Sequence, residues 1–144
     1  MLRQVVLMSI MLFSLTYGQS SKELAEKGNM LWKGFECSEL YRFLGDTIKG
    51  DTFLNIGFNE GRLFLKAIED NKITKEDLYQ VVPKSIEYIL VGPSIDFVLG
   101  RIHMIVSETT IKEITKPDDK YVGEKQAIIN AKKEIEQCGC KSLK

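Results

Sequence analysis

The chain has 144 residues, and its 20 Lys and Arg side chains balance 20 Asp and Glu, so the formal charge at pH 7 is zero. Hydrophobic residues make up 44% and charged residues 28%, which is typical of one globular domain and excludes a disordered, collagen-like or low-complexity chain. Without a basic block the chain is not expected to bind nucleic acid, because phosphate recognition needs a concentrated positive field. One His and three Cys without metal-type spacing exclude most metalloenzymes.

Residues 1–18 predict a secretory signal peptide. Arg3 supplies a positive start, and residues 5–15 are almost continuously apolar. Thr16 and Gly18 are small residues at the −3 and −1 positions for cleavage before Gln19, and cleavage after Ser20 also fits. The apolar run is short for a hydrocarbon layer of about 30 Å, which favours a signal peptide over the alternatives of a membrane anchor or a buried first helix. We therefore expect a periplasmic or secreted protein that does not contact the membrane after cleavage, with a mature domain over residues 19–144.

Helical periodicity dominates the mature chain, and we find no repeat, linker or second domain in it. Stretch 109–123 is the exception, since it either continues a helix or forms a short strand before a turn at 116–119. The prediction is an all-α, small single-domain helical bundle stapled by a disulfide. The predicted helical segments are 21–30 (a short helix or a frayed arm), 38–44, 51–70, 75–81, 83–90, 95–108 and 124–137.

Capping and breaking residues set several of these boundaries. Thr74 with Asp77 resembles a capping box, and Pro83 suits the first position of a helix because its missing N–H is not needed there. The Gly-Pro pair at 92–93 ends one helix and Ser94 caps the next.

Three cysteines in an exported chain allow one intramolecular disulfide and leave one thiol. A bridge from Cys37 to Cys138 or Cys140 closes a loop of about 100 residues, worth up to about 4–5 kcal/mol in the chain-entropy model. Cys138 falls on the apolar face of the last predicted helix and Cys140 on a tail beyond Gly139, so Cys37–Cys138 is the preferred bridge and Cys37–Cys140 the alternative. The Cys138-Gly139-Cys140 pair could instead be a redox site, and the odd thiol could join two chains into a homodimer.

No catalytic arrangement is evident. His103 is the only histidine, and neither a nucleophile nor an orienting carboxylate accompanies it in a recognisable motif. We interpret it as a partly buried or surface residue, with pH sensing as the alternative. The helix-borne carboxylates are interpreted as solvated faces. The sequence therefore predicts no enzyme, no cofactor and no metal site.

Two groups of residues are candidates for binding a protein partner, and for each group packing inside the fold is the alternative. Aromatic side chains surround Cys37, and such side chains often anchor interfaces. Two glycines lie one turn apart in a predicted helix, where they allow either a close helix–helix approach or a shallow docking surface. The candidates are Trp32, Phe35, Tyr41, Phe43, Gly57, Phe58 and Gly61.

The segment 77–88, which reads Asp-Leu-Tyr-Gln-Val-Val-Pro-Lys-Ser-Ile-Glu-Tyr, resembles the central stretch of the HdeA/HdeB periplasmic acid-stress chaperones. Residues 36–40 are similar to the family's first cysteine motif and residues 56–58 to its Val-Gly-Phe sequence, so the resemblance covers about 36–99. The family's second cysteine corresponds to Ile89, so Cys138 or Cys140, on a C-terminal helical extension over about 109–144, would have to replace it.

This resemblance implies an acid-stress holdase that binds unfolding client proteins. Near pH 2–3 most carboxylates are protonated while the cations remain, so self-repulsion would loosen the packing. The aliphatic faces over 53–68 and 95–106 would then be exposed to clients.

A second resemblance is to the Tai-type immunity proteins of type VI secretion systems. Residues 57–61 are similar to the Gly-Tyr-Ile-x-Gly motif of that family, and residues 73–93 to the segment that follows it. This resemblance implies an exported helical protein that neutralises a secreted toxin or effector while folded, at neutral pH. A structural envelope protein is a further alternative.

Overall fold

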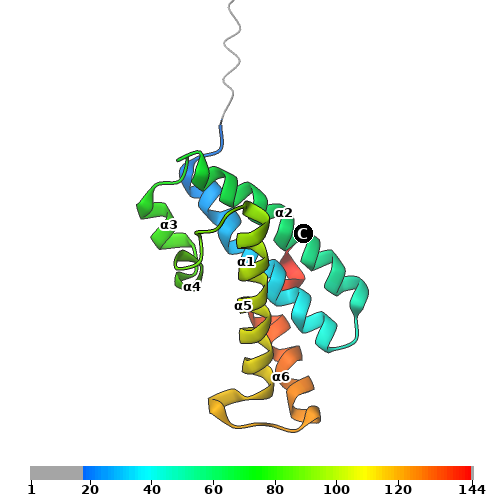
Figure 1. Cartoon of the computed structure of the whole chain (residues 1–144). Coiled ribbons are helices and arrows are strands. Elements are labelled where there is room, and N and C mark those ends of the chain that lie inside the picture. Colours follow the sequence, from blue (N-terminus) through cyan, green and yellow to red (C-terminus); the bar gives the residue numbers. More distant parts are fainter. Residues whose placement is uncertain (1–17, 144) are drawn as a thin grey trace, which may run out of the picture.

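The computed structural model describes residues 18–143, so the predicted signal peptide lies, except for Gly18, outside the described residues. The described part is helical and contains no strand, which confirms the all-α prediction (Figure 1). The elements are α1 (Ser21–Phe43), α2 (Thr47–Glu69), α3 (Lys75–Val81), α4 (Lys84–Glu87), α5 (Ile95–Thr115), the 3-10 turn η1 (Pro117–Asp119), α6 (Glu124–Gln137) and the 3-10 turn η2 (Cys140–Ser142).

Helix α1 is continuous over 23 residues, whereas two separate segments were predicted within it. A capping box starts it at Ser20: the Glu23 N–H donates to Ser20 Oγ at 3.2 Å, and the Ser20 N–H donates to the Glu23 carboxylate at 2.7 Å. Gly28 and Gly34 interrupt the apolar pattern, yet both are buried within the helix. The prediction of a break was wrong because these glycines make room for α2 and do not end the helix.

Helix α2 runs back along α1 as the second arm of a helical hairpin (Figure 1). It begins at Thr47, where the Lys49 N–H donates to Asp46 Oδ1 at 3.1 Å, so the predicted start at residue 51 or 52 was one turn late. Gly45, with a φ of 82°, makes the turn between the helices.

The second half of the chain follows the predicted caps. The Asp77 N–H donates to Thr74 Oγ1 at 3.2 Å at the start of α3, and the Phe97 N–H donates to Ser94 Oγ at 3.2 Å at the start of α5. Helix α4 is a single turn, shorter than the predicted 83–90 helix. Helix α5 continues to Thr115, so the ambiguous stretch is mostly helix, and α6 has the predicted bounds 124–137.

Two hydrophobic cores share α1, α2 and α5. The first core lies under α3 and α4, and the second core lies where α6 and the C-terminal tail return to α1 (Figure 1). The predicted C-terminal extension therefore completes a core with α1 and α2. The first core includes Leu31, Phe35, Phe64, Ile86, Leu99 and Ile102, and the second includes Cys37, Leu40, Phe53, Ile114, Ala131, Ile135 and Cys140.

Within residues 18–143, each helix is too short or too polar to cross a lipid bilayer.

Candidate functional site

Three of the residues proposed for partner binding are buried packing residues. Phe35 is fully buried, and the two glycines are buried in α2. A Cβ added to Gly57 would lie 2.5 Å from Phe35 Cδ1, and one added to Gly61 would overlap the Leu99 and Leu31 side chains. A partner cannot reach Phe35, Gly57 or Gly61 without opening the core, so the alternative interpretation, close helix–helix approach, is the one that the structure supports.

The other four candidates are partly buried and are divided between the two cores. Trp32 and Phe58 pack against the first core, whereas Tyr41 and Phe43 pack against the second. The Phe58 ring meets Phe35 edge-on, with centroids 5.0 Å apart. The sequence suggested an aromatic patch around Cys37. In the structure these four side chains do not form one surface patch, because two pack against each core.

His103 joins α5 to α1. Its Nε2 lies 3.1 Å from Glu39 Oε1, and its ring centroid lies 4.8 Å from that of Phe35. The side chain is partly buried, which agrees with the sequence interpretation. These contacts are those of a packing and hydrogen-bonding residue.

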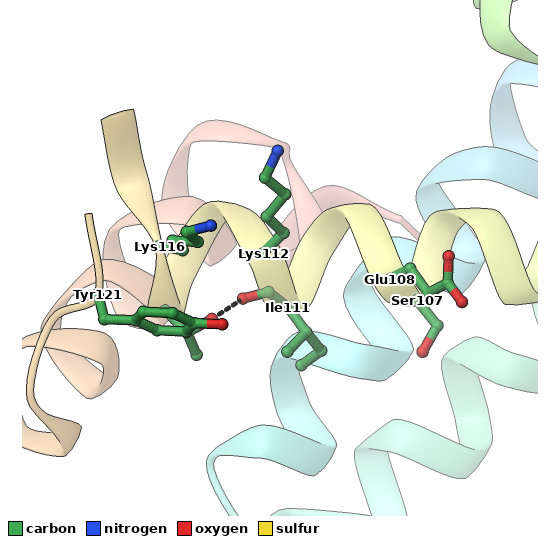
Figure 2. Close-up of a pocket in the computed structure, with 7 residues that line it drawn as sticks. Ser107, Glu108, Ile111, Lys112, Lys116 and Tyr121 are labelled. Atoms are coloured by element: carbon green, nitrogen blue, oxygen red, sulfur yellow. Dashed lines mark hydrogen bonds between the residues drawn. The ribbon is translucent and has the colours of Figure 1, made fainter. Parts of the chain in front are cut away.

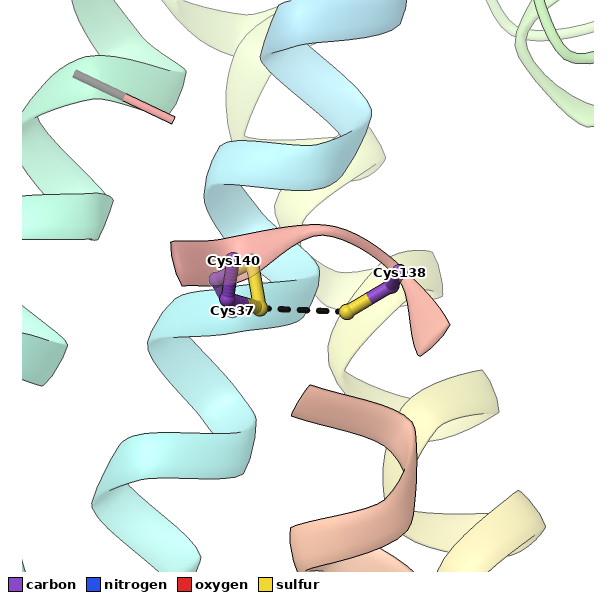
Figure 3. Close-up of side chains that lie close together, drawn as sticks. All are labelled: Cys37, Cys138 and Cys140. Atoms are coloured by element: carbon purple, nitrogen blue, oxygen red, sulfur yellow. Dashed lines mark hydrogen bonds between the residues drawn. A yellow bond between two sulfur atoms is a disulfide. The ribbon is translucent and has the colours of Figure 1, made fainter. Parts of the chain in front are cut away.

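The cysteines pair differently from the preferred prediction. Cys37 is bonded to Cys140, across a sequence separation of 103 residues, and Cys138 is a free thiol. Gly139 explains the difference, because its left-handed conformation, with a φ of 78°, turns the chain back over α1 after α6 ends. Cys140 is thereby buried in the second core while Cys138 is left half-buried. Figure 3 shows the three cysteine side chains lying close together.

The three sulfur atoms nevertheless form one cluster. All three lie within 4.8 Å of one another, and Cys138 Sγ is 3.1 Å from Cys140 Sγ. Thiolates are the form in which cysteine binds metals, so the disulfide leaves only Cys138 as a metal ligand among these residues. Burial first, and then the charges of the neighbouring Glu36 and Glu134 carboxylates, raise the pKa of the Cys138 thiol to about 11, although backbone hydrogen bonds partly oppose the rise.

Carboxylates from three helices face one another beside this cluster. Glu36 on α1, Glu113 on α5 and Glu134 on α6 interact electrostatically. Burial, and then the charges of Glu113 and Glu134, raise the pKa of Glu36, although Lys33 partly opposes them. Burial and Glu134 likewise raise the pKa of Glu113. Burial together with like-charge repulsion therefore favours the protonated forms of Glu36 and Glu113.

A surface stripe on the first half of α5, together with Val91 just before the helix, was not identified from the sequence. We call it the α5 stripe and define it as Val91, Phe97, Arg101 and Met104, of which Arg101 is partly buried and the other three are exposed. The Arg101 guanidinium donates to the Val91 carbonyl at 3.0 Å and lies 5.8 Å from the Phe97 ring centroid. Val91 is 83% exposed, Phe97 48% and Met104 53%. Helix α5 has apolar residues on more than one face, which is more than one core-facing stripe needs. This excess of apolar residues could have indicated the exposed stripe from the sequence.

An open groove lies at the far end of α5, beside the loop that leads to α6 (Figure 2). Ser107 and Glu108 stand at one end of it, and Lys116 and Tyr121 stand at the other (Figure 2). The Thr115 hydroxyl, which also lines the groove, donates to the Ile111 carbonyl at 2.6 Å within the helix. These polar groups do not converge on one point, as a catalytic set would.

The chain matches no protein-family model, and no curated protein or solved structure matches it significantly. The two family resemblances stay predictions, and function is inferred from the geometry and charge of this chain.

Proposed function

We propose that the chain is a small, non-enzymatic, exported protein that binds a folded protein partner at neutral pH through the α5 stripe. The observation that carries this proposal is the exposure of apolar side chains at positions 97 and 104, which lie two turns apart on a single helix face. Contiguous exposed apolar surface is a mark of interaction sites. In line with the second family resemblance, the specific role we propose is that of an immunity or inhibitor protein that neutralises a periplasmic or secreted toxin.

The stripe has the composition of an interface anchor. Phe97 and Met104 supply apolar area, and Arg101 lies between them with its guanidinium held by the Val91 carbonyl. Aromatic side chains, Met and Arg are enriched in protein interfaces. Because a hydrogen bond already orders Arg101, less side-chain entropy would be lost when a partner binds.

Binding in the folded state is favoured over binding by loosened helices. In the folded chain much of the apolar surface over residues 53–68 and 95–106 is buried, including Phe64, Leu99 and Ile102, so clients could reach it only after acid had loosened the packing. The stripe needs no unfolding to be reached.

The test uses the chain from Gln19 as bait at pH 7 in extracts of the source organism. We expect a protein retained by wild type to be lost from the double variant Phe97→Ser/Met104→Ser. Ile129→Ser is the matched control, because Ile129 is 50% exposed on α6, away from the stripe. With the purified partner, a one-to-one complex and a Kd weakened at least tenfold by the double variant are expected. A partner that the double variant binds as tightly as the Ile129→Ser control would contradict the proposal.

An acid-activated holdase is the second candidate, favoured by the charge balance. Protonating 20 carboxylates takes the formal charge of the whole chain from zero towards +20, which would loosen the packing and keep client complexes soluble. Light scattering of an aggregating client enzyme at pH about 2.5 and at pH 7 tests it. Protection only in acid would favour the holdase, and no protection at pH 2.5 would exclude it.

A further inference from the structure

The free thiol of this chain lies against its disulfide. Cys138 Sγ is 3.1 Å from Cys140 Sγ, and the sulfur of Cys37 lies within 4.8 Å of both (Figure 3). A thiolate breaks a disulfide by attacking one of its sulfur atoms. We propose that these residues form an intramolecular thiol–disulfide exchange site, in which Cys138 attacks Cys140 and releases Cys37.

The step is balanced without any other reagent. Cys138 loses its proton to water, and its thiolate forms a bond to Cys140 Sγ. The bond between Cys140 and Cys37 breaks, and Cys37 leaves as a thiolate that takes up a proton. One disulfide and one thiol are present before and after, so no oxidant or reductant is consumed.

The backbone favours Cys140 as the sulfur that is attacked. Cys138 ends α6 and Cys140 begins η2, so only Gly139 separates the two cysteines. A glycine at this position gives the short Cys138–Cys140 ring the greatest conformational freedom. The exchange replaces a bond between α1 and the tail by a bond within the tail, so the tail is no longer covalently held to α1.

The surroundings of the thiol set the rate of exchange. Besides burial, the carboxylates of Glu36 on α1 and Glu134 on α6 disfavour the Cys138 thiolate, and Glu113 on α5 faces Glu36. With a pKa of about 11, the thiolate fraction rises about tenfold with each pH unit below that value. The exchange rate should therefore rise about 100-fold between pH 7 and pH 9.

Tryptic peptides separate the two forms cleanly. Cleavage after lysine and arginine yields peptide 34–42, which contains Cys37, and peptide 134–141, which contains Cys138 and Cys140. In the starting form the two peptides are joined and Cys138 is free. In the exchanged form peptide 34–42 carries a free thiol and peptide 134–141 holds an internal disulfide.

The oxidised chain is incubated at pH 7 and pH 9, quenched in acid, alkylated with N-ethylmaleimide in mildly acidic denaturant and digested for mass spectrometry. We expect alkylated Cys37 to appear about 100-fold faster at pH 9, and not at all in Cys138→Ser. Alkylation confined to Cys138 at both pH values would overturn the proposal. This outcome is independent of partner binding through the α5 stripe.

A second variant tests whether the new bond can form. Cys37→Ser, treated with glutathione disulfide as the oxidant, is expected to close the disulfide inside peptide 134–141 and release two molecules of glutathione. Two alkylated cysteines in that peptide would overturn the proposal, because Cys138 could then not bridge to Cys140. This assay reads a covalent bond and therefore does not depend on how stable the variant is.

Discussion

Gly57 is the residue at which the smallest added group would have a large effect. A Cβ added there would lie 2.5 Å from the ring of Phe35, and a Cβ added to Gly34 on the facing helix would lie 2.6 Å from the Gly57 backbone nitrogen. Both glycines are buried, so the backbones of α1 and α2 approach closely here. The missing side chains fix the distance between the two helices.

Gly57→Ala is expected to lower the free energy of unfolding by about 1–3 kcal/mol, because the ring of Phe35 must shift within a packed core. Gly100→Ala is the matched control, since Gly100 lies in α5, is exposed, and has no atom within 4 Å of an added Cβ. Because alanine has a better helix propensity than glycine, this control substitution should stabilise the chain by about 0.5–1 kcal/mol. Urea unfolding followed by circular dichroism measures both, and equal effects would contradict the close approach.

At the scale of residues, the sequence narrowed the alternatives where one element decided the outcome. The spacing of Gly57 and Gly61 put both on one face of a helix and left a docking surface and close helix packing open, and the structure supports the packing. The disulfide partner could not be predicted in the same way. Cys138 does follow the apolar face of α6, but the turn at Gly139 decides which sulfur reaches Cys37, and that turn depends on how the tail packs against α1.

At the scale of elements, the caps were predicted better than the helix interiors. Thr74 and Ser94 start helices as expected, because a cap is a local hydrogen bond. The break predicted within α1 was wrong, and of the two alternatives left open for the stretch after residue 108, the continued helix is the one found. Tertiary packing carries both helices through glycines and β-branched residues that weaken local propensity. The α5 stripe was missed for a similar reason, since periodicity alone did not show which apolar residues the core could accommodate.

The tail depends on its covalent link to α1. Cys37→Ser is expected to lower the free energy of unfolding by about 2–4 kcal/mol, because the link closes a loop of 103 residues in the unfolded chain. Cys138→Ser keeps the link and should change stability by less than about 1 kcal/mol. Non-reducing urea unfolding gives both values, and hydrogen exchange should show faster exchange of α6 amides in Cys37→Ser. Equal stability of the two variants would contradict a stabilising link.

For the whole molecule, two sets of carboxyl groups respond to acid in opposite directions. Glu23, Asp46, Asp70 and Asp77 lie at the surface, and hydrogen bonds at helix caps and from lysines lower their pKa values. Their stabilisation is present above the unfolded pKa values and is lost as pH falls through the lowered ones. The pKa values of Glu36 and Glu113 are raised instead. Their stabilisation is complete below the unfolded value of 4.5 and is lost as pH rises through the raised values.

These directions predict that the chain resists mild acid. The melting temperature should rise or hold as the pH falls from 7 towards 4.5, because Glu36 and Glu113 take up protons above that ordinary value, and it should fall only at lower pH, where surface carboxylates such as Asp46 lose their charge. Glu36→Gln should stabilise the chain at pH 7 by about 0.5 kcal/mol and reduce the rise in melting temperature as the pH is lowered. Glu26→Gln, at an exposed position of α1, is the control and should have neither effect. Calorimetry across this pH range measures all three proteins. A wild-type melting temperature that falls steadily from pH 7 to 5 would contradict the role of the carboxylates, and would strengthen the case for a holdase over a partner bound in the folded state.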